Sequence, residues 1–168
     1  MTIDYFFSFD KFNYVRNNKS QDCIFCKIIH KDPDITDLSI YEGELFITSL
    51  NLYPYNPGHL LIFPKKHIED VRKYSQKQET RLNQLIHYFL NIIDKTHKPT
   101  GYNIGYNMGL SAGASIKHLH LHIIPRYPSE IGIVDLVAGK RVLIENPRDT
   151  AHKIKKAITQ FPFSISIT

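Results

Sequence analysis

The feature that most constrains this chain is the run His118-Leu119-His120-Leu121-His122, which continues into Ile123-Ile124. A two-residue alternation of polar and aliphatic side chains is typical of a β-strand with one buried face. We therefore expect a strand over residues 117–124, with three imidazoles on one face at intervals of about 6.5–7 Å. The aliphatic residues would enter the core behind them, so that the imidazoles line a polar groove.

A strand face of titratable rings adds little apolar surface to the core. Such a face is therefore expected where phosphate binding, metal binding or proton transfer uses the rings. The row therefore predicts a functional site, whereas the isolated histidines are interpreted as structural: His30, His87, His97 and His152. Two chemistries compete for the row. In metal binding the neutral imidazoles are ligands, and in nucleophilic catalysis one ring nitrogen attacks while a hydrogen bond holds the other.

The two cysteines, Cys23 and Cys26, are too few for a secreted disulfide scaffold. Their Cys-x-x-Cys spacing indicates a metal site or a redox pair. A closed zinc site needs two further ligands, which histidines can supply. The alternative is a pair of free, partly buried thiols.

Composition indicates one globular domain, since 42% of the 168 residues are hydrophobic and 22% are charged. The net charge of +5 is modest, and the basic clusters lack interleaved aromatic residues: Lys65-Lys66, and Lys153 with Lys155 and Lys156. We therefore expect no nucleic-acid partner. Neither a basic leader nor a long apolar stretch is present, so we expect a soluble cytoplasmic protein without a membrane partner.

The pattern along the chain predicts an α+β fold. The expected elements are a helical turn over 23–30, strands over 38–41, 45–49, 59–64, 102–108 and 117–124, a long helix over 75–96 with a Ser75/Gln78 capping box, and a short basic helix over 147–158. Strands that precede one inserted long helix favour a five-stranded antiparallel sheet with one long and one short helix. We expect an N-terminal extension over 1–22, one domain over 23–160 and a tail over 161–168.

Together, these motifs resemble the histidine-triad family of nucleotide hydrolases and transferases. The alternating histidines match the motif that defines the family. Four further stretches agree with it in order and spacing: residues 23–28, residues 58–67, Asn103 with Asn107, and residues 113–115. The resemblance covers about residues 23–127, and it implies the histidine-triad fold, which agrees with the predicted order of elements.

The resemblance implies that His120 is the nucleophile, which attacks the α-phosphorus of a nucleotide and forms a nucleotidyl-histidine intermediate. The phosphate-binding residues it implies are His122, Asn107, Ser115 and His59. The nucleoside-binding residues it implies are Asn51, Ile24, Phe25, Ile28 and Leu52. In zinc-bearing members the ligands correspond to Cys23, Cys26, His67 and His118, and a closed site of four ligands has a structural role.

Residues 51–59 and 101–109 are most similar to the branch of bacterial diadenosine tetraphosphate phosphorylases, in which Asn51 replaces the Asp of most relatives. The chain departs from that branch in having no Trp and in having Tyr127 after Arg126. The resemblance implies a hydrolase or transferase acting on dinucleoside polyphosphates or related adenylylated substrates, and a homodimer. The alternatives are a purine nucleoside phosphoramidase and a zinc-stabilised nucleotide-binding module without significant turnover.

Overall fold

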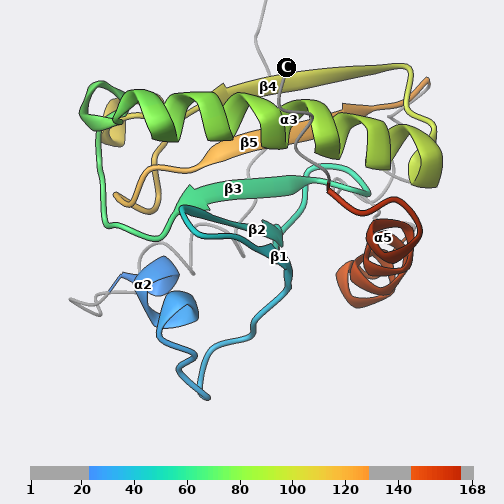
Figure 1. Ribbon diagram of the computed structural model, residues 1–168, viewed down its shortest axis with the longest axis horizontal. Helices are drawn as coiled ribbons and strands as arrows, with labels where there is room; N and C mark the ends of the chain where they lie inside the picture. Colours follow the sequence, from blue (N-terminus) through green and yellow to red (C-terminus); the bar gives the residue numbers. More distant parts are fainter. Residues whose placement is uncertain (1–22, 129–144, 164–168) are drawn as a thin grey trace, which may run out of the picture.

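The computed structural model describes residues 23–128 and 145–163 (Figure 1). One antiparallel sheet has the strand order β1-β2-β3-β5-β4. Its strands are β1 (Ser39–Glu42), β2 (Phe46–Leu50), β3 (Leu60–Pro64), β4 (Gly101–Tyr106) and β5 (Leu121–Arg126). The helices are α2 (Ile24–Ile29), α3 (Gln76–His97) and α5 (Pro147–Gln160), with short 3-10 helices η1 (Val71–Lys73) and η2 (Leu110–Ala112). The five-stranded α+β fold is confirmed, and the turn expected near residue 23 is a third helix.

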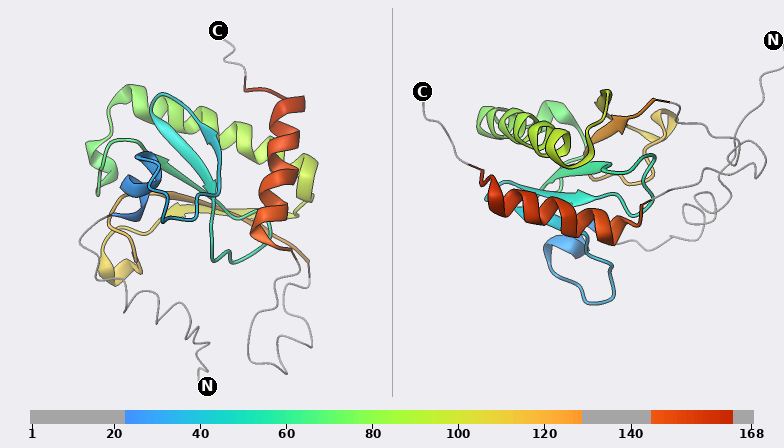
Figure 2. Two further views of the ribbon diagram at one scale, coloured as in Figure 1. Left: turned by 90° about the horizontal axis from the view of Figure 1, so that it is seen from below. Right: turned by 90° about the vertical axis from the view of Figure 1, so that its right-hand side faces the viewer.

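Two layers of helix cover the sheet. Helix α3 lies along one face and α2 lies below the other, while α5 packs at the β1 edge against α3 (Figures 1 and 2). The apolar stripe of α3 is buried against the sheet: Leu82, Leu85, Phe89, Ile92 and Ile93. A second apolar cluster lies on the opposite face, between α2 and the sheet: Phe25, Ile28, Ile47, Leu61 and Phe63. The α2 face is therefore the one that can hold a site, because the long helix fills the other.

The long helix begins as predicted. The Ser75 hydroxyl accepts from the backbone N–H of Gln78, and the Gln78 side chain accepts from the backbone N–H of Ser75. This reciprocal pair satisfies two of the donors that every helix start leaves open. Of the described residues, none lies in a helix that is both long and apolar enough to cross a membrane.

The histidine strand begins later than the alternation predicts, at Leu121. The backbone N–H of Leu119 donates to the Ile68 carbonyl at 2.6 Å, and the His118 carbonyl accepts from the His120 ring at 2.9 Å. These bonds replace the ladder bonds that the first residues of the predicted strand would make. The prediction for the aliphatic residues is confirmed, because Leu119, Leu121 and Ile123 are in the core.

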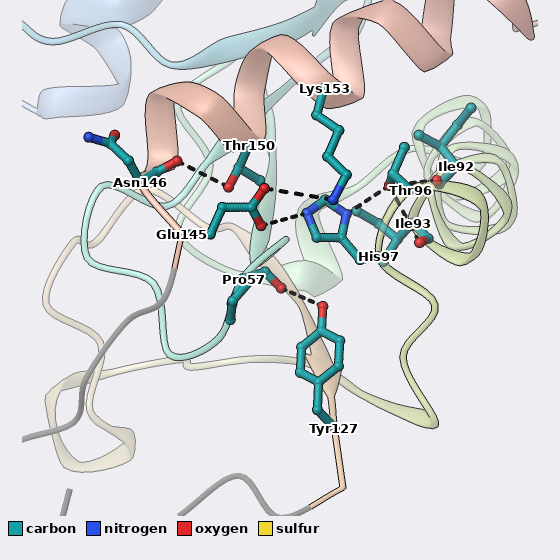
Figure 3. A network of polar contacts seen from close by, with 10 residues as sticks. All are labelled: Pro57, Ile92, Ile93, Thr96, His97, Tyr127, Glu145, Asn146, Thr150 and Lys153. Atoms are coloured by element: carbon teal, nitrogen blue, oxygen red, sulfur yellow. Dashed lines mark hydrogen bonds and ion pairs between the residues drawn. The ribbon is translucent and has the colours of Figure 1, made fainter. Parts of the chain in front are cut away.

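A polar network joins the end of α3 to the start of α5 (Figure 3). The ring of His97 contacts Thr96 at 2.7 Å and Glu145 at 3.1 Å, and Lys153 lies 3.7 Å from the same carboxylate. Nearby, the Tyr127 hydroxyl donates to the Pro57 carbonyl at 2.9 Å, which fixes the loop before β3 against the end of β5.

The structure describes the first residues of the expected C-terminal tail but none of the expected N-terminal extension. The predicted extension over residues 1–22 lies outside the described residues, as do residues 164–168. At the start of the expected tail, Lys95 lies 4.4 Å from the Phe161 ring and Arg81 lies 4.2 Å from the Phe163 ring. Residues 161–163 are thus packed on α3.

Candidate active site and metal centre

One pocket on the α2 face brings together the predicted nucleoside residues and most of the predicted phosphate residues. Helix α2 contributes one wall, the loop after β2 a second, and the loop between β4 and β5 a third. The predicted residues that line it are Ile24, Phe25, Ile28, Asn51, Leu52, Asn107, Ser115, His120 and His122. His59 does not line the pocket, but it is fully buried and reaches His122 from the position just before β3.

The His120 ring is held by one backbone hydrogen bond. Its Nδ1 lies 2.9 Å from the His118 carbonyl, and a carbonyl can only accept. Nδ1 therefore carries the hydrogen, which leaves a lone pair on Nε2. Burial lowers the pKa of His120, and the hydrogen bond to the carbonyl opposes this shift. The ring is thus suited to act as a neutral nucleophile.

The His59 and His122 rings form a chain whose hydrogens can be assigned from the network. The backbone N–H of Tyr55 donates to Nδ1 of His59 at 3.1 Å, so the hydrogen of His59 is on Nε2. That nitrogen lies 3.0 Å from Nδ1 of His122, which must accept. The hydrogen of His122 is therefore on Nε2, where it can donate to an anion in the pocket.

Asn51 is part of the same network. The backbone N–H of Tyr53 donates to Oδ1 of Asn51 at 3.0 Å, which orients the amide. Its Nδ2 then lies 3.4 Å from Nδ1 of His59. The Tyr55 ring stacks on His59 with centroids 5.2 Å apart. Sequence reasoning missed both tyrosines, although the loop that carries them was part of the resemblance.

Asn107 and Ser115 reach the pocket from the start and the middle of the loop between β4 and β5. Asn107 directly follows β4, and Ser115 follows η2. Gly113 closes η2 with a φ of 81°, a conformation that few side chains tolerate. This turn brings the chain back, so that Ser115 lines the same pocket as the two histidines.

The four predicted metal ligands also come together, with all ligand atoms within 4.8 Å of one another. The Nδ1 of His118 lies 3.4 Å from the Cys23 sulfur and 3.6 Å from the Cys26 sulfur, and the Nδ1 of His67 lies 3.3 Å from the Cys26 sulfur. Tetrahedral zinc with its usual bond lengths places sulfur and nitrogen ligands about 3.6 Å apart. The donor set and its spacing therefore fit a four-coordinate metal.

The surroundings of the cluster agree with this fit. Nε2 of His118 donates to the Pro64 carbonyl at 2.8 Å, which leaves Nδ1 as the ligand atom. Burial lowers the pKa of His118 to about 4, so this lone pair is available at neutral pH. Glu69 lies 3.4 Å from the outer nitrogen of His67. Of the histidine row, His118 thus belongs to the Cys/His cluster that could hold a metal, while His120 and His122 line the pocket.

The comparisons with known proteins agree with the fold and with the family that the sequence motifs predict. The HIT domain family model matches residues 32–129, and the chain belongs to this histidine-triad family. It is 33% identical over 122 residues to a protein of Mycobacterium tuberculosis named AP-4-A phosphorylase, an alignment that covers 70% of this chain and 63% of the relative. It is 31% identical over 97 residues to the asymmetrical bis(5'-nucleosyl)-tetraphosphatase of Schizosaccharomyces pombe, covering 58% of this chain and 53% of the relative.

A solved structure shows the same fold. The Zn-bound histidine triad family protein of Mycobacterium smegmatis superposes with a TM-score of 0.68 at 24% identity, covering 84% of this chain and 96% of that one. The chain spans less than two thirds of the length of the two enzymes named above.

Proposed function

We propose that the chain is a nucleotidyl hydrolase or transferase that cleaves the α-phosphate linkage of dinucleoside polyphosphates or related adenylylated substrates. One observation carries the proposal: the rings of His120 and His122 lie side by side in one pocket, with centroids 4.8 Å apart. The first ring has a lone pair and the second an N–H, as a nucleophile and a donor to the same phosphate require.

In this proposal Nε2 of His120 attacks the α-phosphorus, and a nucleotidyl-histidine intermediate forms. The N–H groups of His122 and Asn107 and the hydroxyl of Ser115 donate to the phosphate oxygens, whose charge shifts during the displacement. The N–H of His59 donates to Nδ1 of His122 and so holds the His122 ring in place. Because these donors are held in place before the reaction, they need no reorganisation during it.

The apolar end of the pocket is proposed to bind the nucleoside. Ile24, Phe25 and Ile28 from α2 and Leu52 from the loop after β2 would contact the base, and Asn51 would bind the ribose. This proposal is supported by the position of these five residues, which line the same pocket as His120 and His122. The Phe25 ring lies 5.0 Å from that of His120, so a base at this wall is within reach of the phosphate position.

We also propose that Cys23, Cys26, His67 and His118 hold zinc. A closed site of four ligands has no open position for a substrate, so the metal would stabilise the fold. The homodimer and the cytoplasmic location stay predictions. A dimer is supported by the edge strand β4, on which Ile104 is exposed.

The test is a set of single-turnover rates with diadenosine tetraphosphate. We expect His120→Ala to abolish release of adenine nucleotides while adenosine monophosphate still binds, because a nucleophile lowers the barrier more than it adds affinity. Asn107→Ala and Ser115→Ala should lose no more than the ~10²–10³-fold typical of one oxyanion donor. If His120→Ala kept more activity than either of these, the roles would be wrong. A wild-type protein that binds the monophosphate but cleaves no polyphosphate would be a binding module.

A further inference from the structure

We propose that the hydroxyl of Ser49 determines which base the pocket accepts. It selects a purine with an amino group at position 6, as in adenine, over a purine with an oxygen there, as in guanine or hypoxanthine. This inference rests on the proposed function, because it concerns the nucleoside bound in the same pocket. The apolar residues proposed to contact the base pack equally well on any purine ring, so a choice between purines needs a polar group at the edge of the base.

Ser49 lies on the floor of the pocket. Side chains alternate between the two faces of a strand, and Ile47, two residues before Ser49 on β2, belongs to the apolar cluster between α2 and the sheet. Ser49 therefore points to the α2 face, and it lines the pocket together with Asn51, the residue proposed to bind the ribose.

The register of the sheet fixes how far Ser49 lies from the phosphate residues. Leu61 on β3 pairs with Ser49 on β2 and with His122 on β5, three strands that are neighbours in the sheet (Figure 1). All three residues line the pocket, so they form one row across its floor. Because neighbouring strands are about 4.7–4.9 Å apart, the row spans roughly 9.5 Å. In an extended nucleotide, a similar length separates the α-phosphate from the group at position 6, which projects furthest from the sugar.

The hydrogen of the Ser49 hydroxyl is already used. Ser49 is only 3% exposed, and its hydroxyl donates to the Leu50 carbonyl at 3.0 Å. A hydroxyl has one hydrogen and two lone pairs, so the Ser49 oxygen presents lone pairs to the pocket. These can accept a hydrogen bond from the amino group of adenine. An oxygen at position 6 would either face them with no hydrogen between the two atoms, or would take the hydrogen from Leu50; in both cases a buried polar atom loses its partner.

A second hydroxyl in the pocket lacks this selectivity. Thr36 also lines the pocket, but it is exposed. Water can hydrate its hydroxyl, which can turn to donate or to accept. The preference at position 6 is therefore assigned to Ser49, whose hydroxyl is buried and oriented by Leu50.

The experiment measures the Kd of three nucleotides by calorimetry: the 5′-monophosphates of adenosine, inosine and purine riboside. In the wild type we expect inosine monophosphate to bind about tenfold more weakly than adenosine monophosphate. Purine riboside monophosphate keeps the N1 of adenosine but has only a hydrogen at position 6. It should bind with intermediate affinity, because it loses the hydrogen bond without opposing two acceptors.

The variant Ser49→Ala should bring the ratio of the inosine and adenosine Kd values close to one. Thr48→Val is the matched control, because it deletes the neighbouring hydroxyl on β2. Thr48 alternates with Ser49 and so lies on the opposite face of the sheet. It is buried, and within the described part of the chain its hydroxyl has no hydrogen-bond partner. The ratio in Thr48→Val should therefore equal that of the wild type.

Inosine monophosphate that binds the wild type as tightly as adenosine monophosphate, or more tightly, would overturn the proposal. So would a ratio that Ser49→Ala leaves unchanged, or one that Thr48→Val lowers as much. A wild-type protein that shows the expected preference but cleaves no diadenosine tetraphosphate would contradict the proposed function and support the role of Ser49. A protein that binds none of the three nucleotides would contradict both.

Discussion

Removing the metal from the proposed zinc centre should lower the melting temperature of this protein by about 5–10 °C. The cluster joins segments far apart in the sequence, since His67 and His118 lie 41 and 92 residues from Cys26. An ion that binds only the folded chain stabilises it by about 2.7 kcal/mol when its concentration is a hundred times its Kd. For a chain of this size, about 1 kcal/mol moves the melting temperature by roughly 2–4 °C.

The assay is thermal unfolding with and without a strong chelator, together with elemental analysis of protein purified without added metal. The Cys23→Ser/Cys26→Ser double variant is the control. It should contain no metal, and its melting temperature should not respond to the chelator. Wild-type protein that carries no metal and melts at the same temperature in both conditions would refute the reasoning, and would leave the two thiols as ordinary half-buried cysteines.

Two further predictions concern stability alone. Ser75→Ala should lower the free energy of unfolding by about 1 kcal/mol in urea, because the start of α3 loses its cap; no change would mean that the capping box is not formed in solution. Hydrogen bonds from the side chain and backbone of Arg72 lower the pKa of Asp70 from 3.8 to about 2. The charged carboxylate therefore stabilises the fold above pH 3.8, and this contribution is lost as the pH falls towards 2. Asp70→Asn should thus flatten the acid dependence of stability between about pH 4 and 2, and an unchanged profile in urea unfolding would contradict this.

The elements that could be predicted from the sequence are those with local causes. The long helix was predictable because its apolar period and its Ser75/Gln78 cap depend only on residues close together in the sequence. The start of β5 was not, because it depends on two contacts from outside the pattern. The Leu119 N–H donates to the Ile68 carbonyl, which lies before α3. The His118 carbonyl accepts from the His120 ring, two residues further along the chain.

The candidate site divides in the same way. The fold brings the nucleoside and phosphate residues implied by the resemblance to one pocket, except His59, which lies behind His122. It also brings the four implied metal ligands into one Cys/His cluster. The hydrogen positions on His59 and His122 could not be predicted, because they depend on the register of β3 against β5 and on a backbone N–H in the loop after β2. A residue type does not indicate where a main-chain donor will point.

Helix α2 has a consequence for how preparations of this protein would behave. Its six residues are too few to form a stable helix alone, and it carries pocket residues such as Phe25 next to the cysteine pair. Outside the metal cluster, it is attached to the sheet mainly by apolar packing, with the Phe25 ring stacked 4.2 Å from that of Phe63. Loss of the metal would therefore loosen the wall of the nucleoside pocket while the His59–His122 contact, made elsewhere, stayed in place. Two batches that differ only in metal content would then differ in KM far more than in kcat.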